Sequence, residues 1–357
     1  WIFRKIFISI KMKKIIYRII ITSIVLLSSI ILFLSTVGIK TDKFNSKIIS
    51  QIKNIEPNID VKINDVSAKL NLFDLTINAK TFGTDLIYKK KIIKIENIKS
   101  KISLKSVIKN QFAITEISIS TKFLPIKDLI NFIRLFNNNT KLFIAEQFIE
   151  NGNIVADLKL EFDNSGKVKS NYTVNGLVKD GQFSFIKKTK ISKVDFIFQV
   201  TDKEFRINDA KLLFNKKNFT VPELIILKKN NEFLVSGNLN NQNLNLDEKE
   251  IRNFISDEFL KKNLKEITFD TKSNFSFKLD KNFKFKDFDL ESIINLNYLK
   301  LNNFLKLKTN FPNINNIIVF KNHNIKLEYR KKNLNIIGSG NIFLQEAPDI
   351  FQYNLTK

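Results

Sequence analysis

From Ile59 almost to the end of this chain, apolar and polar residues alternate with a period of two. Between Ile154 and Phe162, for example, Ile, Ala, Leu and Phe alternate with Val, Asp, Lys and Glu. Successive side chains of a β-strand point to opposite faces of a sheet, so such runs predict strands with one apolar and one polar face. The sequence therefore predicts a mainly β fold.

Short polar clusters separate many of these runs and predict hairpin turns, because Asn, Asp and Gly tolerate the left-handed conformations that tight turns need. Hairpins between consecutive strands imply an antiparallel meander. The expected turns are Asp163–Gly166, Asp180–Gly181, Asn215–Asn218, Asn230–Asn231, Asp280–Asn282 and Asn322–Asn324. His323, which falls in the last of them, is expected to be a solvated turn residue.

Before the strands, the run from Ile19 to Ile39 contains no charged residue and is 21 residues long. A helix of ~20 residues crosses the ~30 Å hydrocarbon core of a bilayer, so this run predicts a transmembrane helix. Lys13, Lys14 and Arg18 precede it and favour a cytoplasmic N-terminus by the positive-inside tendency. The rest of the chain is then expected on the other side of the membrane.

A cleaved signal peptide is the alternative interpretation of this run. Its length exceeds the 7–15 apolar residues typical of signal peptides, and Thr36-Val37-Gly38 is a poor cleavage site, so an uncleaved anchor is favoured. Met12 is the one methionine and is the expected start, which makes residues 1–11 upstream read-through. The alternative is that the chain is a fragment of a longer protein.

The expected organisation has three parts after residue 11: a transmembrane anchor at 12–40, a membrane-proximal amphipathic helix at 41–57 and a β domain at 58–357. The helix is predicted because Phe44, Ile48, Ile52 and Ile55 share one helical face, and Pro57 ends it. Two further helices are expected within the β domain, at Pro125–Phe136 and about Asp247–Asn263.

Composition excludes several chemistries. The chain has no Cys, one His and 9 Gly, which rules out disulfides, thiolate metal sites and multi-histidine sites, and no glycine-rich phosphate loop is present. No carboxylate pair of the glycosidase kind stands out either. The sequence predicts a protein that is not an enzyme and needs no cofactor or metal.

The excess of basic over acidic residues is spread along the whole chain. Its 59 Lys and Arg against 35 Asp and Glu give a formal charge of +24, but they form no single patch. Nucleic-acid binders usually concentrate basic residues with interleaved aromatics, so nucleic acid is not the expected partner. An evenly basic surface favours contact with anionic lipid head groups.

An antiparallel sheet with one apolar face must cover that face. A second sheet, a closed barrel or a curl into an open trough are the three solutions, and periodicity does not choose between a sandwich and a trough. About 16 strands at roughly 4.8 Å each would make a sheet of ~75 Å along its pairing direction. That length is unusual for a compact domain and suits a conduit.

The order of features resembles the N-terminal part of the AsmA-like family, the group that includes TamB and YhdP. The resemblance rests on the anchor, on GIKTDKFNSKIISQI and IDVKINDVSAKLNLFDLTINAK, and on the stretch KIIKIENIKSKISLKSVIKNQFAITEISIS. In that stretch Ser103 and Ser106 surround Leu104, and the family's hydrophobic positions are filled by Ile98, Ile102, Leu104, Val107, Ile108, Phe112, Ile114, Ile117 and Ile119. The later hairpins, such as residues 151–185, are similar to the family's repeated meander.

The resemblance implies a mainly β fold with one N-terminal transmembrane helix, a long curved antiparallel sheet that forms an open groove or trough, and a few short helices. It implies a single-pass protein of the bacterial inner membrane, with its bulk in the periplasm, that assists phospholipid transport to the outer membrane and envelope integrity. The chain is short for the family, so a C-terminal portion is expected to be missing.

The expected ligands are phospholipid acyl chains held by alternating apolar residues of the sheet. The candidate groove residues are Ile117, Ile119, Leu158, Leu160, Val194, Phe196, Phe198, Val200, Phe233, Val235, Phe275, Phe277, Ile325 and Leu327. The alternative function is an assembly factor for outer-membrane or envelope proteins, whose exposed strand edge templates other strands.

Overall fold

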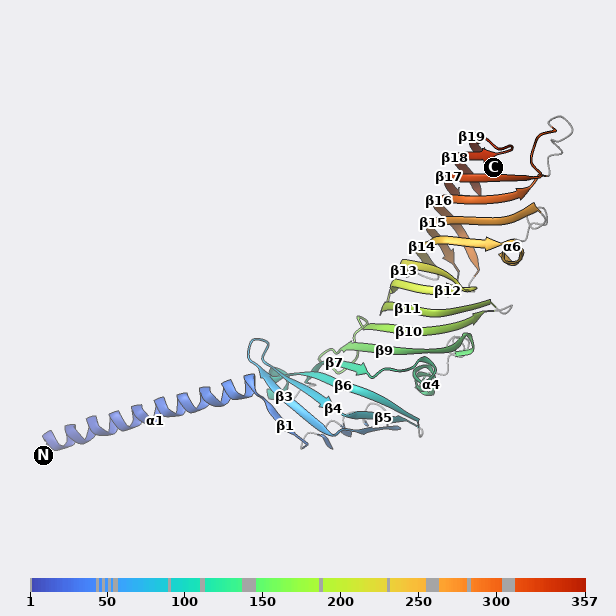
Figure 1. Ribbon diagram of the computed structural model, residues 1–357. Coiled ribbons are helices and arrows are strands. Elements are labelled where there is room, and N and C mark those ends of the chain that lie inside the picture. Colours follow the sequence, from blue (N-terminus) through green and yellow to red (C-terminus); the bar gives the residue numbers. More distant parts are fainter. Residues whose placement is uncertain are drawn as a thin grey trace. The chain divides into compact units, whose positions relative to one another are not determined.

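The computed structural model describes residues 2–42, 45–46, 49–50, 53, 57–88, 91–109, 113–136, 146–185, 189–229, 232–254, 263–280, 284–303 and 312–357. The fold is mainly β, with one long, open antiparallel sheet and an apolar N-terminal helix (Figure 1). This confirms the predicted fold class. Two compact units divide the chain: unit 1 comprises 1–124, 135–137 and 156–173, and unit 2 comprises 125–134, 138–155 and 174–357.

The N-terminal helix α1 runs from Ile2 to Thr36, and its segment Lys14–Thr36 is long and apolar enough to span a membrane. It ends before the predicted Ile39, because Val37 and Gly38 both donate their N–H to the Phe33 carbonyl at 2.9 and 3.0 Å. Gly38 has φ +78°, the left-handed conformation that ends helices. Ile39 already belongs to strand β1 (Ile39–Thr41).

Unit 1 is organised around the long strand β6 (Lys91–Ser103). Strands β4 (Thr76–Phe82) and β5 (Thr84–Tyr88) pair with one side of β6, and β7 (Ile114–Thr121) pairs with its other side. The remaining elements of this unit are β2 (Ile59–Lys62), β3 (Asp65–Asn71), the short helix α3 (Leu104–Ile108) and the second half of β9 (Ile149–Glu161).

The predicted membrane-proximal helix is seen only in pieces. Asn45, Ser46, Ile49, Ser50 and Lys53 are helical. Its predicted apolar face, which consists of Phe44, Ile48, Ile52 and Ile55, lies outside the described residues.

Unit 2 is an antiparallel meander in which each strand pairs with the next (Figure 1). Its strands are β10 (Thr173–Phe185), β11 (Thr189–Thr201), β12 (Glu204–Phe214), β13 (Lys217–Lys229), β14 (Glu232–Asp247), β15 (Leu264–Leu279), β16 (Phe285–Asn302), β17 (Ile317–Arg330), β18 (Asn333–Phe343) and β19 (Asp349–Thr356). The strand β8 (Leu124–Pro125) leads into helix α4 (Ile126–Phe136), and α6 (Glu248–Phe254) follows β14. Both predicted helices are present, although residues 255–262 of the second lie outside the described residues.

Hairpin turns were predicted with mixed success. The turn at Asn215 and Lys216 is confirmed, with φ 47° and 65°. Lys331 and Lys332 form a similar turn, with φ 50° and 68°, that the sequence did not predict because Lys is not a typical turn residue. Asn230–Asn231 and most of Asp280–Asn282 lie outside the described residues.

The predicted turns at Asp180–Gly181 and Asn322–Asn324 are wrong, because both segments lie inside strands, in β10 and β17. Their Asp and Asn adopt the left-handed conformation at points of irregularity within the strand, and similar residues recur in neighbouring strands. The mid-strand residues other than glycine with positive φ are Asp180, Lys193, Asp209, Asn243, Asp287 and Asn322. The pairing registers shift beside Lys193, Asp209, Asn243, Asp287 and Asn322, which identifies β-bulges. A bulge bends its strand and increases its twist, so a series of bulges curls the sheet.

Carboxylates on neighbouring strands satisfy the backbone at two of these irregular points. The N–H of Asp180 donates to Asp195 Oδ1 at 2.8 Å, and the Asp195 carboxylate also binds the Lys179 ammonium. In the same way the Asn243 N–H donates to Asp270 Oδ1. Burial raises the pKa of Asp195, but the hydrogen bonds from Lys179 and the Asp180 N–H, with the Lys179 and Lys211 charges, outweigh it and hold this pKa below its usual value.

We expect Asp195→Asn to lower the free energy of unfolding at pH 7 by about 1 kcal/mol, because the variant loses charge-assisted bonds to the irregular segment. Since the folded pKa of Asp195 is lowered, its contribution is present above the unfolded value of about 3.9 and is lost as pH falls through the folded pKa. Denaturant unfolding of the detergent-solubilised chain at pH 7 and at about pH 2 measures this difference. Asp209→Asn, which removes a charge at a bulge of the next strand, is the control. Equal stability of native chain and Asp195→Asn at pH 7 would contradict the account.

Candidate functional site

One face of unit 2 carries a continuous row of directly opposed residues that crosses eight strands. Each member is the register partner of the next, from β11 to β18. The row consists of Phe198, Ile207, Leu224, Gly237, Phe275, Leu290, Tyr329 and Leu334. Apart from the glycine, every position is apolar or aromatic. We call the face that bears this row the apolar face.

Parallel rows extend the apolar face along the strands. A second row joins Val200, Phe205, Ile226, Val235 and Phe277. Leu327 is opposed by Ile336, which is opposed by Leu355, and Ile325 is opposed by Gly338, which is opposed by Tyr353. Phe233, another candidate, is opposed by Leu279. Val194 and Phe196 alternate with Asp195 on β11 and share the face of Phe198, since the Phe196 and Phe198 rings lie 6.1 Å apart.

The four remaining candidates belong to unit 1. There Ile117 is opposed by Leu160, and Ile119 by Leu158, so all four share one face of the β7–β9 pair. Ile98 of β6 continues that face beside Ile119. The structure thus brings each group of candidates together within its own unit.

The apolar face is shielded although it belongs to a single layer. Val235 and Phe198 are only 4% and 7% exposed, whereas Ile197 and Ile293 on the opposite face are 49% and 55% exposed. Among the described residues no second sheet packs against this one. Figure 1 shows the strands β14–β18 curling from the front of the view to the back. On the inside of such a curl side chains converge and cover one another, so we assign the apolar face to the concave side.

Helix α6 covers part of the apolar face. Its Ile251 is fully buried against Leu244, Leu246 and Leu264, and Phe269 and Leu299 pack around this cluster. Each fully buried Ile or Leu contributes about 1.5–3 kcal/mol through the hydrophobic effect. This cluster is therefore an ordinary protein core at one end of the strands, and the rows described above lie beside it.

Aromatic rings line the apolar face near the hairpin of β15 and β16. The Phe277 and Phe285 rings stack with centroids 4.5 Å apart, and Phe285 contacts Phe288 at 5.5 Å. Phe288 in turn lies 5.9 Å from Tyr329. Phe285 remains exposed, so the end of this aromatic run is accessible from solvent.

Sequence reasoning missed about half of the apolar face. Phe205, Ile207, Leu224, Ile226, Leu290 and Tyr329 were not selected as candidates. In β13 the continuous apolar run from Leu224 to Leu227 hides which residues share a face. For Phe205 and Ile207 the available signal was their alternation with Arg206 and Asn208, and Tyr329 continues the alternation of Ile325 and Leu327.

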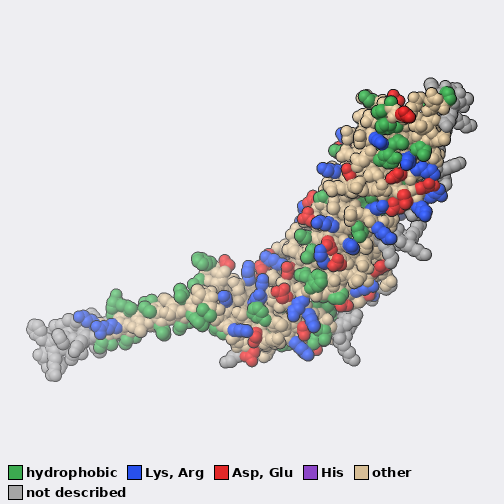
Figure 2. Space-filling model, viewed as in Figure 1, with side chains coloured by type: hydrophobic (Ala, Val, Ile, Leu, Met, Phe, Trp, Pro, Cys, Tyr) green, Lys and Arg blue, Asp and Glu red, His purple; other side chains and the backbone are tan. Residues whose placement is uncertain are grey.

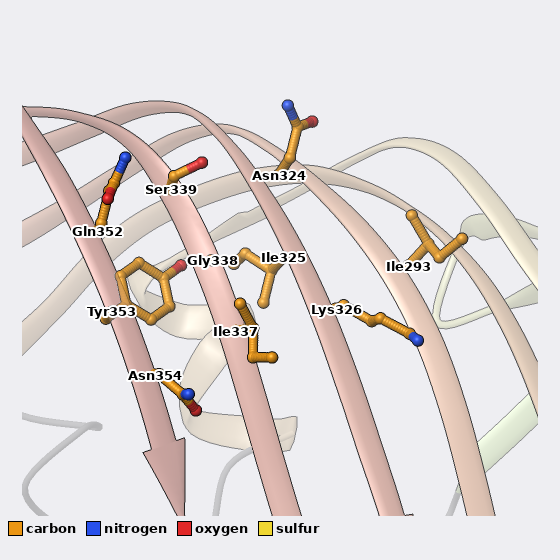
Figure 3. A pocket seen from close by; sticks show the side chains of 10 residues that line it. All are labelled: Ile293, Asn324, Ile325, Lys326, Ile337, Gly338, Ser339, Gln352, Tyr353 and Asn354. Atoms are coloured by element: carbon orange, nitrogen blue, oxygen red, sulfur yellow. The ribbon is translucent and has the colours of Figure 1, made fainter.

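A hollow of about 720 Å³ lies on strands β16 to β19 (Figure 3). Ile293, Lys326, Ile337 and Asn354 line it, and they form one cross-strand row on the face opposite to the apolar face. Lys326 is the one charged residue of the lining, and it is bound to Glu328 at 2.7 Å. The hydrogen bond and charge of Glu328 raise the pKa of Lys326. Ile325, one of the candidate residues, also lines the hollow, together with Gly338 and Tyr353.

Cross-strand ion pairs occupy the polar face. Arg206 binds Glu223 of the next strand and also Glu204 of its own strand, at 2.6 Å. Lys326 approaches Glu291 of the preceding strand and also binds Glu328 of its own strand. Figure 2 shows basic and acidic side chains interspersed over the visible side of the molecule, without a large patch of one sign. Such exposed pairs contribute little stability each, and here they keep one face of the sheet in water.

His323 is not a solvated turn residue, as the sequence suggested, but a buried member of the apolar face. It is 1% exposed, follows the bulge at Asn322 in β17, and lies opposite Leu296. Its ring packs between Phe320 at 5.5 Å and Tyr353 at 5.8 Å, and Nε2 lies 3.1 Å from the Asn341 carbonyl. An Asn-His-Asn sequence is typical of a turn, but here it forms a β-bulge within a strand.

Gly340 makes room for the His323 ring. A Cβ at Gly340 would lie 2.3 Å from His323 Cδ2 and 2.7 Å from its Cα, closer than side chains approach in proteins. We expect Gly340→Ala to destabilise unit 2 by about 1–3 kcal/mol, since the ring and backbone must shift. Ser339→Ala, at the neighbouring exposed position of the opposite face, is the matched control. Unfolding midpoints in denaturant test this, and equal midpoints for the two variants would contradict the packing described.

No family model, curated protein or solved structure matches this chain. Its function is therefore inferred from its own surfaces. In the described part of the chain, no group of three or more His, Cys, Asp or Glu residues is placed to hold a metal ion. The largest organised feature of unit 2 is the apolar face, with its cross-strand rows.

Proposed function

We propose that this chain is an AsmA-like, single-pass inner-membrane protein whose apolar face holds the acyl chains of phospholipids in the periplasm. In this role it assists phospholipid transport between the inner and outer membranes and so supports envelope integrity. The observation that carries the proposal is the unbroken apolar row from Phe198 to Leu334. It needs neither a catalytic group nor a cofactor.

The dimensions of the row suit a lipid. Its eight strands are separated by about 4.8 Å each, so the row crosses about 34 Å, which is comparable with the ~30 Å hydrocarbon core of a bilayer. Each methylene group that leaves water for this surface contributes roughly 0.8 kcal/mol. Acyl chains are thus retained along the row while the head groups stay in water at the open side of the curl.

A binding surface without a deep free-energy minimum allows a bound lipid to move along it. Neighbouring positions of the row carry similar apolar groups, such as Ile207 and Leu224, so adjacent registers of an acyl chain have similar free energies. When an acyl chain moves along the row by one strand, it exchanges equivalent contacts, so the free-energy barriers to this movement are low. A closed pocket lined by charged residues would instead fix one ligand in one place.

In this proposal helix α1 is the membrane anchor. Its segment Lys14–Thr36 is long and apolar enough to cross a bilayer, and most of its apolar side chains are exposed. Lys13, Lys14 and Arg18 at its start favour a cytoplasmic N-terminus, which supports the proposed periplasmic location of both units.

Photo-crosslinking in living bacteria tests the lipid-binding role. A benzoylphenylalanine at Phe277, in the second row, is expected to form adducts with phospholipid that carries radioactive phosphate. The same probe at Ile293, which is exposed on the opposite face, is the matched control and is expected to give little adduct. Equal labelling at the two positions would contradict the proposal.

A charged substitution sharpens this test. Phe198→Asp places a carboxylate in the central row and is expected to reduce adduct formation at Phe277 several-fold, whereas Ile197→Asp on the other face leaves it unchanged. Circular dichroism checks that both variants keep their β-sheet. Adducts with proteins in place of lipid, lost when proline is placed in an edge strand, would favour the alternative role as an assembly factor.

A further inference from the structure

The hairpin between β3 and β4 presents large apolar side chains to solvent. Phe73 at its tip is 101% exposed, and Leu72 and Leu75 beside it are also exposed. The tip is well ordered by hydrogen bonds: Asn71 Oδ1 accepts the N–H groups of Phe73 and Asp74 at 3.0 and 3.2 Å. An ordered turn that holds a phenyl ring fully in water indicates a surface made for another phase or partner.

The short helix α3 adds two residues to this surface. Leu104, its first residue, donates its N–H to the Leu75 carbonyl at 3.0 Å, and Ser103 caps the helix by accepting the Ser106 N–H. Val107 is exposed and Ile108 is 84% exposed. We call Leu72, Phe73, Leu75, Val107 and Ile108 the hairpin patch.

The hairpin patch lies at the end of unit 1 where α1 joins the sheet. Ile39, just after α1, is opposed by Ala68 of β3, and the Lys69 ammonium donates to the Thr36 carbonyl at 3.0 Å. Because β1 and β3 are antiparallel, β3 continues past this point toward the helix. The tip begins three residues beyond Lys69, about 10 Å farther on. Figure 1 shows the loop between β3 and β4 beside this end of α1.

We propose that the hairpin patch inserts into the interfacial region of the bilayer, in the leaflet next to the C-terminal end of α1. The inference rests on the proposed role of α1 as a membrane anchor. A membrane is the partner that fits this patch, because the patch lies beside the end of α1 that emerges from the bilayer in the proposed topology. Exposed Lys105 and Lys109 on α3 add attraction to anionic head groups. Helix α1 and the hairpin patch together then fix the orientation of unit 1 relative to the membrane.

Tryptophan fluorescence of the full chain in vesicles tests this inference. Trp1, the one tryptophan, is first replaced by phenylalanine. Phe73→Trp then reports on the patch in vesicles of phosphatidylcholine and phosphatidylglycerol, with bromine in the upper part of the acyl chains as quencher. We expect a blue-shifted emission and loss of most of the intensity in brominated vesicles.

Phe123→Trp is the matched control, because Phe123 is also exposed but follows Thr121, which pairs with Ile95 of β6, eight residues before the Ser103 that caps α3. It is expected to emit as in water without quenching. Leu26→Trp, in α1, reports on the anchor itself. Quenching of Leu26→Trp without quenching of Phe73→Trp would overturn the inference and leave the anchor in place. Absence of quenching at Leu26→Trp would overturn the anchor and the inference together.

Discussion

The curl of a single-layer sheet is the constraint on which the structure of unit 2 depends. An apolar face that extends over the nine strands β11 to β19 has to be shielded from water, and no second sheet among the described residues covers it. Bulges at Lys193, Asp209, Asn243 and Asn322 bend β11, β12, β14 and β17, so that side chains on one face converge. The result is low exposure at Val235 and Phe198 without a covering layer, and a surface that remains open along the strands.

The polar residues inside the strands thus have a structural role. Bulges free backbone groups from the ladder, and carboxylates of neighbouring strands accept hydrogen bonds at Asp180 and Asn243. Both hydrogen bonds are exposed to solvent, so each contributes about 0.5–1.5 kcal/mol to the stability of the curl at these points. Sheet geometry and the lipid-binding role proposed for the apolar face are linked through these contacts.

Much of this architecture could be predicted from the sequence, because period-two alternation is a direct consequence of strand geometry. The strands and the shared face of Phe275 and Phe277 follow from this alternation, and the antiparallel order follows from the short connections between the strands. The helices near Ile126 and Glu248 follow from the helical spacing of their apolar residues. What escaped prediction has a common cause. A bulge and a hairpin turn need the same residues, so Asp180 and Asn322 were interpreted as turns and His323 as solvated. The Lys331–Lys332 turn has no typical residues, and the partners of Phe198 across strands depend on registers that only the structure supplies.

The central claim is that the apolar face binds lipid, and native mass spectrometry of the full chain tests it most directly. The chain is purified from bacterial membranes without added lipid and compared with the Phe198→Asp, Phe277→Asp double variant, which shares the same α1. The account predicts bound phospholipid in the native chain and a clear reduction in a double variant that keeps its β-sheet signal. Identical lipid occupancy in the two chains, or a folded native chain without lipid, would contradict it.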